Sequence, residues 1–201
     1  MADCDAKLSG KFARQCGHKP KQGIQKKWYF NWDDVDRVAT TMVNRNTKVE
    51  ALVLKAGTYI YPAEGNVKTS RGSHSLSVLD FGNGYIHTDG FTIMYRGEEE
   101  RERIQELVEG GRVGTIIQNI DTGVNGELSY DILGLESGML VTEDNWSSSE
   151  NSGTTTLTVA TQEGEEEATG KKLFLMPAAV EATDLEETEA WIAANEFVPA
   201  P

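Results

Sequence analysis

Residues 97–141, GEEERERIQELVEGGRVGTIIQNIDTGVNGELSYDILGLESGMLV, decide the expected fold, because one charged helical segment is followed there by two β segments. Three glutamates at 98–100 fill the first helical turn, where negative charge meets the positive end of the helix dipole. Gly110 and Gly111 end the helix, since glycine adopts the conformation of a helix C-terminus without strain. We therefore expect one helix between two regions of β structure.

This helix has a single narrow apolar stripe, formed by Ile104, Leu107 and Val108. Such a stripe suits a helix on the flank of a sheet, because deep burial demands a wider apolar face. Residues 112–120 and 127–135 then have strand composition, and a connection rich in Gly, Asp and Asn joins them. The pattern predicts a hairpin directly after the helix.

The region before the helix is also predicted to be β structure. Residues 28–32, WYFNW, place Trp28, Phe30 and Trp32 on one face of a strand, the first element of the core. A hairpin is expected from strands 49–54 and 58–61, joined by 55–57. Residues 66–75 are expected to form a polar loop. A further strand pair is expected from 76–81, 85–86 and 91–95, around a turn at 82–84.

After the hairpin, the chain alternates between short strands and polar loops. Thr183 and Glu186 form a capping-box pattern, which opens a C-terminal helix carrying Leu185, Trp191 and Ile192. The segments expected before it are a brief strand beyond Gly138, a polar loop at 142–153, a β-branched strand at 154–161, a flexible acidic loop at 163–170 and a last strand at 173–176.

Together these patterns predict a mainly β fold, a β-sandwich or barrel, with one flanking α-helix near the middle and a short C-terminal helix. Residues 1–25 are polar and basic, so we expect an extended N-terminal arm that a partner orders. Residues 26–201 are expected to form a single β-rich domain with long loops and the C-terminal helix.

The net charge of −13 is unevenly distributed along the chain. Residues 1–72 hold 13 basic and 7 acidic side chains, whereas residues 73–201 hold 6 basic and 25 acidic ones. Such a molecule favours head-to-tail assembly of a basic arm on the acidic body of another copy. The alternative interpretation is that solvated acidic loops gathered in the C-terminal part.

Two cysteines, the absence of a long apolar run and the polar first residues indicate a soluble protein made in a reducing cytoplasm, with free thiols and no membrane anchor. The histidines are His18, His74 and His87. Ser73-His74-Ser75 places a base beside hydroxyls, but adjacent strand residues point to opposite faces and nothing nominates an acid. We therefore expect no enzyme and no catalytic residues.

Metal and cofactor sites are not expected either. Cys4, Cys16 and His18 supply three zinc-ligand types without a CxxC pair. Residues 33–36 contain three aspartates but lack the glycine and distal glutamate of a calcium loop, so a solvated helix cap is the expected role. The glycines of 110–114 follow a helix and precede a strand, the reverse of a phosphate-binding loop.

Nucleic acid is a further class of ligand that the charge pattern bears on. An N-terminal basic cluster has the charge to contact phosphate, but the acidic body repels duplex at long range. Such a surface suits DNA that slides past without specific binding. The cluster consists of Lys7, Lys11, Arg14, Lys19, Lys21, Lys26 and Lys27.

Two segments carry a family resemblance: GVNGELSYDILGLESGMLVTE, within the region that starts at Val113, and CGHKPKQGIQKKWYFNWDDVDR near the N-terminus. With the order of elements, they resemble tail tube and ring-forming virion proteins of tailed bacteriophages, in particular those of phages of gut Bacteroidales-type bacteria. The resemblance implies a virion protein whose copies join edge to edge into rings, with other tail or connector proteins as partners and DNA passing through the channel. It also implies that a hairpin lines the channel, either 113–120 with 128–135 or the one within 49–61.

Two other functions are kept open. One is a non-enzymatic β-sandwich binding module that recognises carbohydrate or protein through exposed Trp28, Trp32 and Trp146, although tryptophans more often fill cores. The other is an enzyme that uses His74 or His87, for which no substrate class can be named.

Overall fold

The computed structural model describes residues 10–12, 18–63, 69–79, 82–149, 154–178 and 182–199. These residues form two β-sheets and two α-helices, α1 (Glu98–Val108) near the middle of the chain and α2 (Asp184–Asn195) near its end. Neither of these sheets closes on itself. The expected mainly β fold with these two helices is therefore confirmed, and the closed barrel is not formed.

The larger sheet has seven strands, and all neighbouring pairs are antiparallel except β3 with β11. The smaller sheet has four antiparallel strands. In spatial order the larger sheet contains β2 (Thr41–Val43), β3 (Lys48–Ala51), β11 (Lys172–Phe174), β8 (Tyr130–Leu133), β7 (Val113–Asn119), β1 (Ile24–Asn31) and β4 (Ile60–Ala63). The smaller contains β5 (Arg71–Leu79), β6 (Gly82–Ile93), β10 (Thr155–Ala160) and β9 (Leu140–Trp146).

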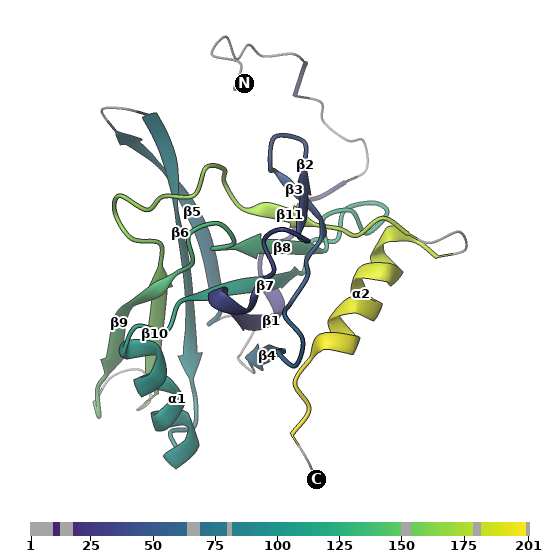
Figure 1. Cartoon of the computed structure of the whole chain (residues 1–201). Helices are drawn as coiled ribbons and strands as arrows, with labels where there is room; N and C mark the ends of the chain where they lie inside the picture. Colours follow the sequence, from purple (N-terminus) through teal and green to yellow (C-terminus); the bar gives the residue numbers. More distant parts are fainter. Residues whose placement is uncertain are drawn as a thin grey trace.

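The seven-stranded sheet is the middle layer of the molecule (Figure 1). One face packs against α2 through a core that includes Trp28, Phe30, Ile116 and Ile132. The opposite face packs on the four-stranded sheet through a second core of buried residues. Because successive strand residues point to opposite faces, the central strands are apolar on both sides. The second core consists of Ile24, Val113, Ile117, Leu133, Met139 and Val159.

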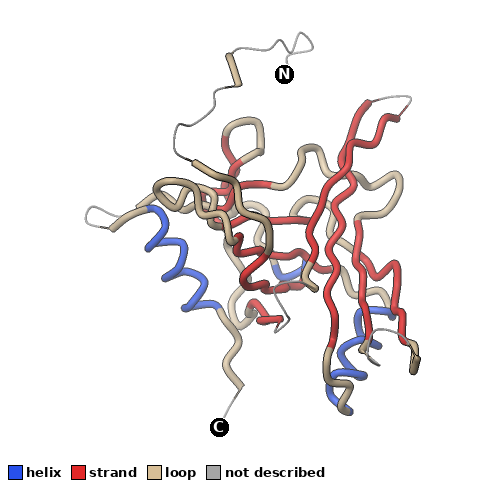
Figure 2. The backbone as a smooth tube through the Cα atoms, turned by 180° about the vertical axis from the view of Figure 1, so that it is seen from behind, coloured by secondary structure: helices blue, strands red, loops and turns tan. Residues whose placement is uncertain are grey.

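The view from behind shows the same layers, with the four long strands on one side and α2 on the other (Figure 2). α1 lies at one end of the four-stranded sheet, beside β9 and β10 (Figure 1). Ile104 is the buried residue of α1, and Leu107 packs against the second core. Val108 is exposed, so the narrow stripe supports a flanking helix as expected.

α2 begins with the expected capping box. The Thr183 side chain accepts a hydrogen bond from the Glu186 N–H, and the Glu186 side chain accepts one from the Thr183 N–H. The two contacts satisfy backbone donors that the first helical turn leaves free. Trp191 then stands edge-on against the ring of Phe174, which fastens the helix to the seven-stranded sheet.

The expected hairpin within 49–61 is wrong. β3 lies near one edge of the seven-stranded sheet, between β2 and β11, whereas β4 forms the opposite edge beside β1. Pro62 explains the place of β4, because proline lacks the N–H of a ladder hydrogen bond and is tolerated on an edge strand. Two adjacent apolar segments therefore pair with distant strands and not with each other.

The two expected polar loops are largely strands where the structure describes them. Residues 71–75 belong to β5, and residues 142–146 belong to β9. Long antiparallel partners supply backbone hydrogen bonds that outweigh the weak strand propensity of these polar residues. The β5–β6 strand pair was expected with a turn at 82–84, but Gly82 pairs with Leu79, so residues 82–84 belong to β6.

The predicted strand at 28–32 is β1, which begins at Ile24, so the last two residues of the predicted arm belong to the sheet. Trp28 and Phe30 are buried, whereas Trp32 lies in a short 3-10 helix, η1 (Trp32–Asp34). β7 and β8 pair in the expected hairpin. The strand expected at 154–161 is β10, and the last strand is β11.

Candidate functional site

A buried polar cluster joins the two sheets. The Lys27 Nζ on β1 donates to Asp89 Oδ1 on β6 at 2.5 Å, and also to the carbonyl oxygens of Arg71 and Gly90. The Tyr29 hydroxyl donates to the second oxygen of Asp89. Lys27 and Asp89 are 2% and 0% exposed, so this ion pair is cut off from solvent.

Burial sets the protonation behaviour of this cluster. It lowers the pKa of Lys27 and raises that of Asp89, and the attraction between the two groups opposes both shifts. Burial also raises the pKa of Tyr29, and the nearby Asp89 charge raises it further. The Lys27 ammonium donates all three of its N–H groups to fixed acceptors, so it holds the two sheets together. An ammonium in this arrangement has no lone pair with which to act as a base or nucleophile.

The acidic segment expected as a flexible loop is fastened by reciprocal contacts. Glu167 is fully buried, and its carboxylate accepts from the N–H groups of Glu136 and Ser137 at 2.9 Å. The Glu136 carboxylate in turn accepts from the N–H of Ala168. Lys172 Nζ lies 3.6 Å from Glu167 and 3.5 Å from Glu136, which balances part of the buried charge. We call these four residues and Ala168 the acidic clasp.

His87 lies beside the acidic clasp, in the interior. Its Nδ1 accepts from the Gly134 N–H and its Nε2 donates to the Thr169 carbonyl, both at 3.0 Å. Burial lowers the pKa of His87 to about 4, so the ring is neutral near pH 7. His74 pairs with it across the β5–β6 ladder, at 6.2 Å between ring centroids. Both nitrogens of His87 are engaged by backbone groups, so none is free to activate a hydroxyl.

The other residues expected in polar sites do not converge. His18 Nε2 lies 3.1 Å from Asp121, while Cys4 and Cys16 lie outside the described residues. Asp33 and Asp34 belong to η1, and the Asp36 carboxylate accepts from the N–H groups of residues 38 and 39 in a solvated turn. In the described parts of the chain, no group of three or more His, Cys, Asp or Glu side chains is placed to hold a metal ion.

The glycines of 110–114 have structural roles. Gly110 takes a left-handed φ of 112° at the end of α1. At Gly114 a Cβ atom would overlap the Phe30 ring, so glycine is needed for close packing of β7 on β1.

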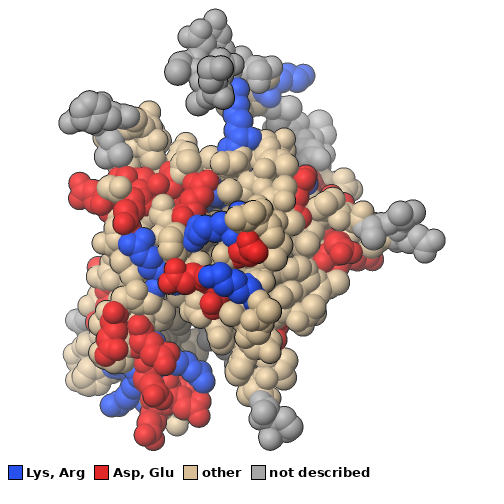
Figure 3. Space-filling view, viewed as in Figure 1, with Lys and Arg blue, Asp and Glu red and all other residues tan. Residues whose placement is uncertain are grey.

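The predicted basic cluster is only partly on the surface. Lys11, Lys19, Lys21 and Lys26 are exposed, Lys7 and Arg14 lie outside the described residues, and Lys27 is buried. Lys27, a member of the basic cluster, therefore has no access to phosphate. Figure 3 shows acidic side chains gathered over α1, a charge distribution that disfavours a bound duplex on this face.

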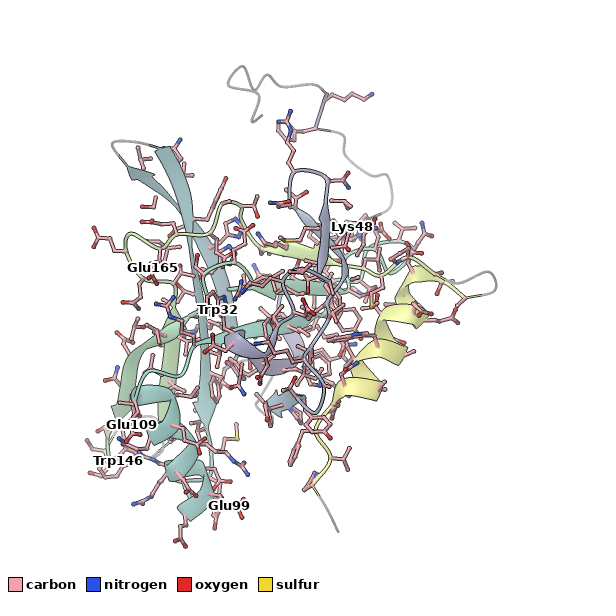
Figure 4. All side chains as sticks on the ribbon, in the orientation of Figure 1. Trp32, Lys48, Glu99, Glu109, Trp146 and Glu165 are labelled. Carbon is pink, nitrogen blue, oxygen red and sulfur yellow. The ribbon has the colours of Figure 1, made fainter. Side chains whose placement is uncertain are left out.

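The three tryptophans proposed as platforms differ in exposure. Trp28 is 4% exposed and its Nε1 donates to Glu196, so it is a core residue. Trp32 is covered by Arg37, whose guanidinium carbon lies 3.7 Å from the ring centroid. Trp146 is 56% exposed at the end of β9 and lies far from Trp32 (Figure 4). The rings therefore do not form one platform.

The outer edges of the four-stranded sheet form the candidate assembly surface. Among the described residues, no further strand pairs with β5 or β9 on its outer side. β5 is nine residues long and β9 seven, and neither contains proline or lysine. Leu76 and Val78 of β5 are 55% and 76% exposed. A long exposed edge strand is a template for pairing with another chain, and of the protective features β9 has the charged residues Glu143 and Asp144 while β5 has Arg71.

The edges of the seven-stranded sheet are protected by contrast. β2 is only three residues long. β4 carries Pro62, and the C-terminal segment covers it, with the Phe197 N–H donating to the Ile60 carbonyl. Tyr59 and Tyr61 also contact the Phe197 ring. These are ordinary means of blocking edge pairing, so within the described structure the four-stranded sheet is the one that offers long edges to a partner.

The structure changes which hairpin can face a channel. β7 is almost wholly buried and β8 wholly so, because cores cover both faces of the middle sheet. The 113–120 and 128–135 hairpin therefore cannot line a channel in this fold, and the segment 49–61 is no hairpin. In the β5–β6 hairpin, β5 is exposed along most of its length, whereas β6 carries the fully buried His87 and Asp89.

Comparisons with protein-family models, with curated proteins and with solved structures found no match to this chain. No helix in the described parts of the chain is long and apolar enough to cross a membrane. Sequence reasoning missed the buried charges of Lys27, Asp89 and Glu167. Of these residues, only Lys27 carried a sequence signal of burial, because it lies on the same strand face as Tyr29. Glu167 stands in a run of acidic residues, which gives no indication that this one side chain is buried.

Proposed function

We propose that this chain is a bacteriophage virion structural protein that assembles into rings or a tube forming part of the tail or head–tail conduit for DNA. The observation that carries the proposal is the contrast between the two sheets. The seven-stranded sheet has blocked edges, whereas the four-stranded sheet leaves β5 and β9 open at opposite sides within the described structure. A chain with two different open edges on one sheet is suited to head-to-tail pairing of copies.

In this proposal, β5 of one copy pairs with β9 of the next. β9 carries Glu143 and Asp144, and β5 carries Arg71, so their charges favour this pairing over β9 with itself. A repeated heterologous contact closes into a ring when the rotation between copies allows it. Acidic side chains, including those of α1, disfavour tight binding of DNA to the assembled protein.

The test uses lysine substitutions on the open edge. Negative-stain microscopy and sedimentation of the full chain are expected to show rings or tubes. Leu76→Lys and Val78→Lys should reduce the assembled fraction at least about tenfold, because lysine on an edge strand opposes pairing. Val124→Lys, at a residue 57% exposed on the β7–β8 connection, is the matched control and should leave assembly unchanged.

A shortened chain tests the predicted arm. Removing residues 1–22 leaves β1 whole and should weaken stacking of rings more than formation of a single ring. A full chain that stays monomeric at high concentration, or lysine variants that assemble as the parent does, would contradict the proposal.

A second candidate function is a non-enzymatic module that binds carbohydrate or protein. It is favoured by the exposure of Trp146, together with Tyr95 at 74% and Met94 at 58%. Binding on a glycan array that disappears in Trp146→Ala would support this function. Loss of assembly in the β5 variants with unchanged array signal would instead favour the virion protein.

A further inference from the structure

A groove lies between the second half of α2 and the strands beneath it. It has a volume of about 240 Å³ and is lined by residues of β1, β7 and β8 together with α2. Its apolar wall is formed by Ile192 and Ala193, and the rings of Trp28 and Tyr130 lie at its floor. The remaining lining residues are polar: Lys26, Gln118, Glu189 and Glu196.

Hydrogen bonds fix the polarity of this floor. An ionised carboxylate only accepts hydrogen bonds, so the Tyr130 hydroxyl donates a hydrogen bond to Glu189 at 3.4 Å. The same hydroxyl accepts a hydrogen bond from the Gln118 amide nitrogen at 3.0 Å. This sequence turns the Gln118 Oε1 away, where it is buried without a donor in the described structure. The buried Gln118 Oε1 therefore adds negative potential near the groove without being exposed to a ligand in it.

Two carboxylates and the helix end add negative potential. Glu196 Oε2 accepts a hydrogen bond from Trp28 Nε1 at 2.9 Å, and Glu189 accepts one from the Tyr130 hydroxyl. Glu196 is the C-cap residue of α2, where the helix dipole is negative, whereas Glu189 lies in the middle of the helix, and the last turn of α2 contains no basic residue. Lys26 is exposed and lines the groove, and it forms no ion pair with another described residue.

We propose that this groove binds a primary ammonium group carried on an unbranched alkyl chain. The carboxylates of Glu189 and Glu196 take the ammonium, and the methylene groups lie against Ile192 and Ala193. A free diamine and a lysine side chain from another copy share this chemistry. The proposal does not depend on ring assembly, because every residue of the groove comes from one chain.

The experiment is isothermal titration calorimetry on the full chain with 1,4-diaminobutane at constant ionic strength. We expect saturable binding in the millimolar range and no binding of 1,4-butanediol, which has the same length without charge. The double variant Glu189→Gln and Glu196→Gln should bind about tenfold more weakly, because it keeps side-chain shape and loses both charges. Glu187→Gln, on the same helix outside the groove, should bind as the parent does.

Two further arms sharpen the test. Lys26→Met removes the cation that lines the groove and should strengthen binding, the opposite sign from the glutamate variants. A peptide of residues 1–23 is then compared with the same peptide in which glutamine replaces each lysine. Binding of the lysine peptide in competition with the diamine assigns the ammonium to another copy, and binding of the diamine alone assigns it to a free amine.

Several results overturn the proposal. These are the absence of saturable heat with both probes, equal binding of butanediol, and unchanged diamine affinity in the glutamine variants. Glu196 also contacts Trp28, so thermal unfolding checks that its variant is folded. Glu189→Gln alone, at an exposed position, keeps the test decisive if the double variant does not fold.

Discussion

Lys27 Nζ lies 2.5 Å from Asp89 Oδ1, and this buried ion pair links β1 of the seven-stranded sheet to β6 of the four-stranded sheet. The carbonyls of Arg71 and Gly90 complete the ammonium's hydrogen bonds. Transfer of two charges from water is costly, so each partner is tolerated only because the other is present.

Loss of one partner of this pair is expected to destabilise the protein strongly. Asp89→Leu leaves an uncompensated ammonium, and Lys27→Met leaves an uncompensated carboxylate, so each should lower the free energy of unfolding by about 3–5 kcal/mol. The double variant should cost clearly less than the sum of the two, as measured by urea unfolding. Additive losses would show that the two charges do not depend on each other.

Acid is expected to destabilise the fold through His87. Its pKa is about 4 in the folded chain and 6.5 as the ordinary value, so the unfolded state takes up the proton first as pH falls. The contribution of neutral His87 to the free energy of unfolding is complete above pH 6.5 and is lost as the pH falls from 6.5 to 4. At pH 5 the free energy of unfolding should be lower by about 2 kcal/mol from this group. Urea unfolding at several pH values measures this slope.

His87→Phe supplies the comparison for that slope. The variant is less stable at pH 7, because the Gly134 N–H and Thr169 carbonyl lose their partner. Its stability should nevertheless fall less between pH 7 and 5 than that of the parent. Parallel curves for the two proteins would rule out His87 as the group that titrates.

Glu167 is expected to contribute strongly to stability through the acidic clasp. Glu167→Ala leaves the N–H groups of Glu136 and Ser137 without their acceptor and removes one of the two carboxylates near Lys172, so it should cost about 2–4 kcal/mol. Glu163→Ala removes an exposed carboxylate from the same segment and should change stability by less than about 0.5 kcal/mol. Equal effects in thermal unfolding would mean that net charge, and not the clasp, matters.

Gly114 is expected to tolerate no side chain. In Gly114→Ala the added Cβ overlaps the Phe30 ring, so overpacking should cost about 1–3 kcal/mol. Gly90→Ala is the strand control, since its Cβ would meet atoms at 3.6 Å or more, an ordinary contact. Calorimetric unfolding of both variants compares them, and a neutral Gly114→Ala would show that β1 and β7 can separate at this point.

Local patterns were sufficient for several elements. Three glutamates and a terminal Gly110 set the ends of α1, and the Thr183–Glu186 pair set the start of α2, because caps and dipoles act within one turn. The β7–β8 hairpin followed from two apolar segments around a short connection. Each of these features depends on residues that are neighbours in the sequence.

The same local reasoning failed where partners are distant. β3 and β4 looked like a hairpin, yet they lie near opposite edges of one sheet. Polar residues 71–75 and 142–146 became strands because β6 and β10 supply their backbone partners. Of the candidate site residues, the sequence pointed to His87, but its neutral, fully bonded state depends on Gly134 and Thr169.

The sequence by itself determined the mainly β class, the positions of both helices and the uneven charge, since periodicity, caps and composition are local properties. Only the tertiary structure decided which strands pair, which charges are buried and which sheet edges stay open. The physical reason is that pairing and burial depend on contacts between residues far apart in the chain. Lys27 and Asp89 meet across 62 positions, and no local pattern encodes that meeting.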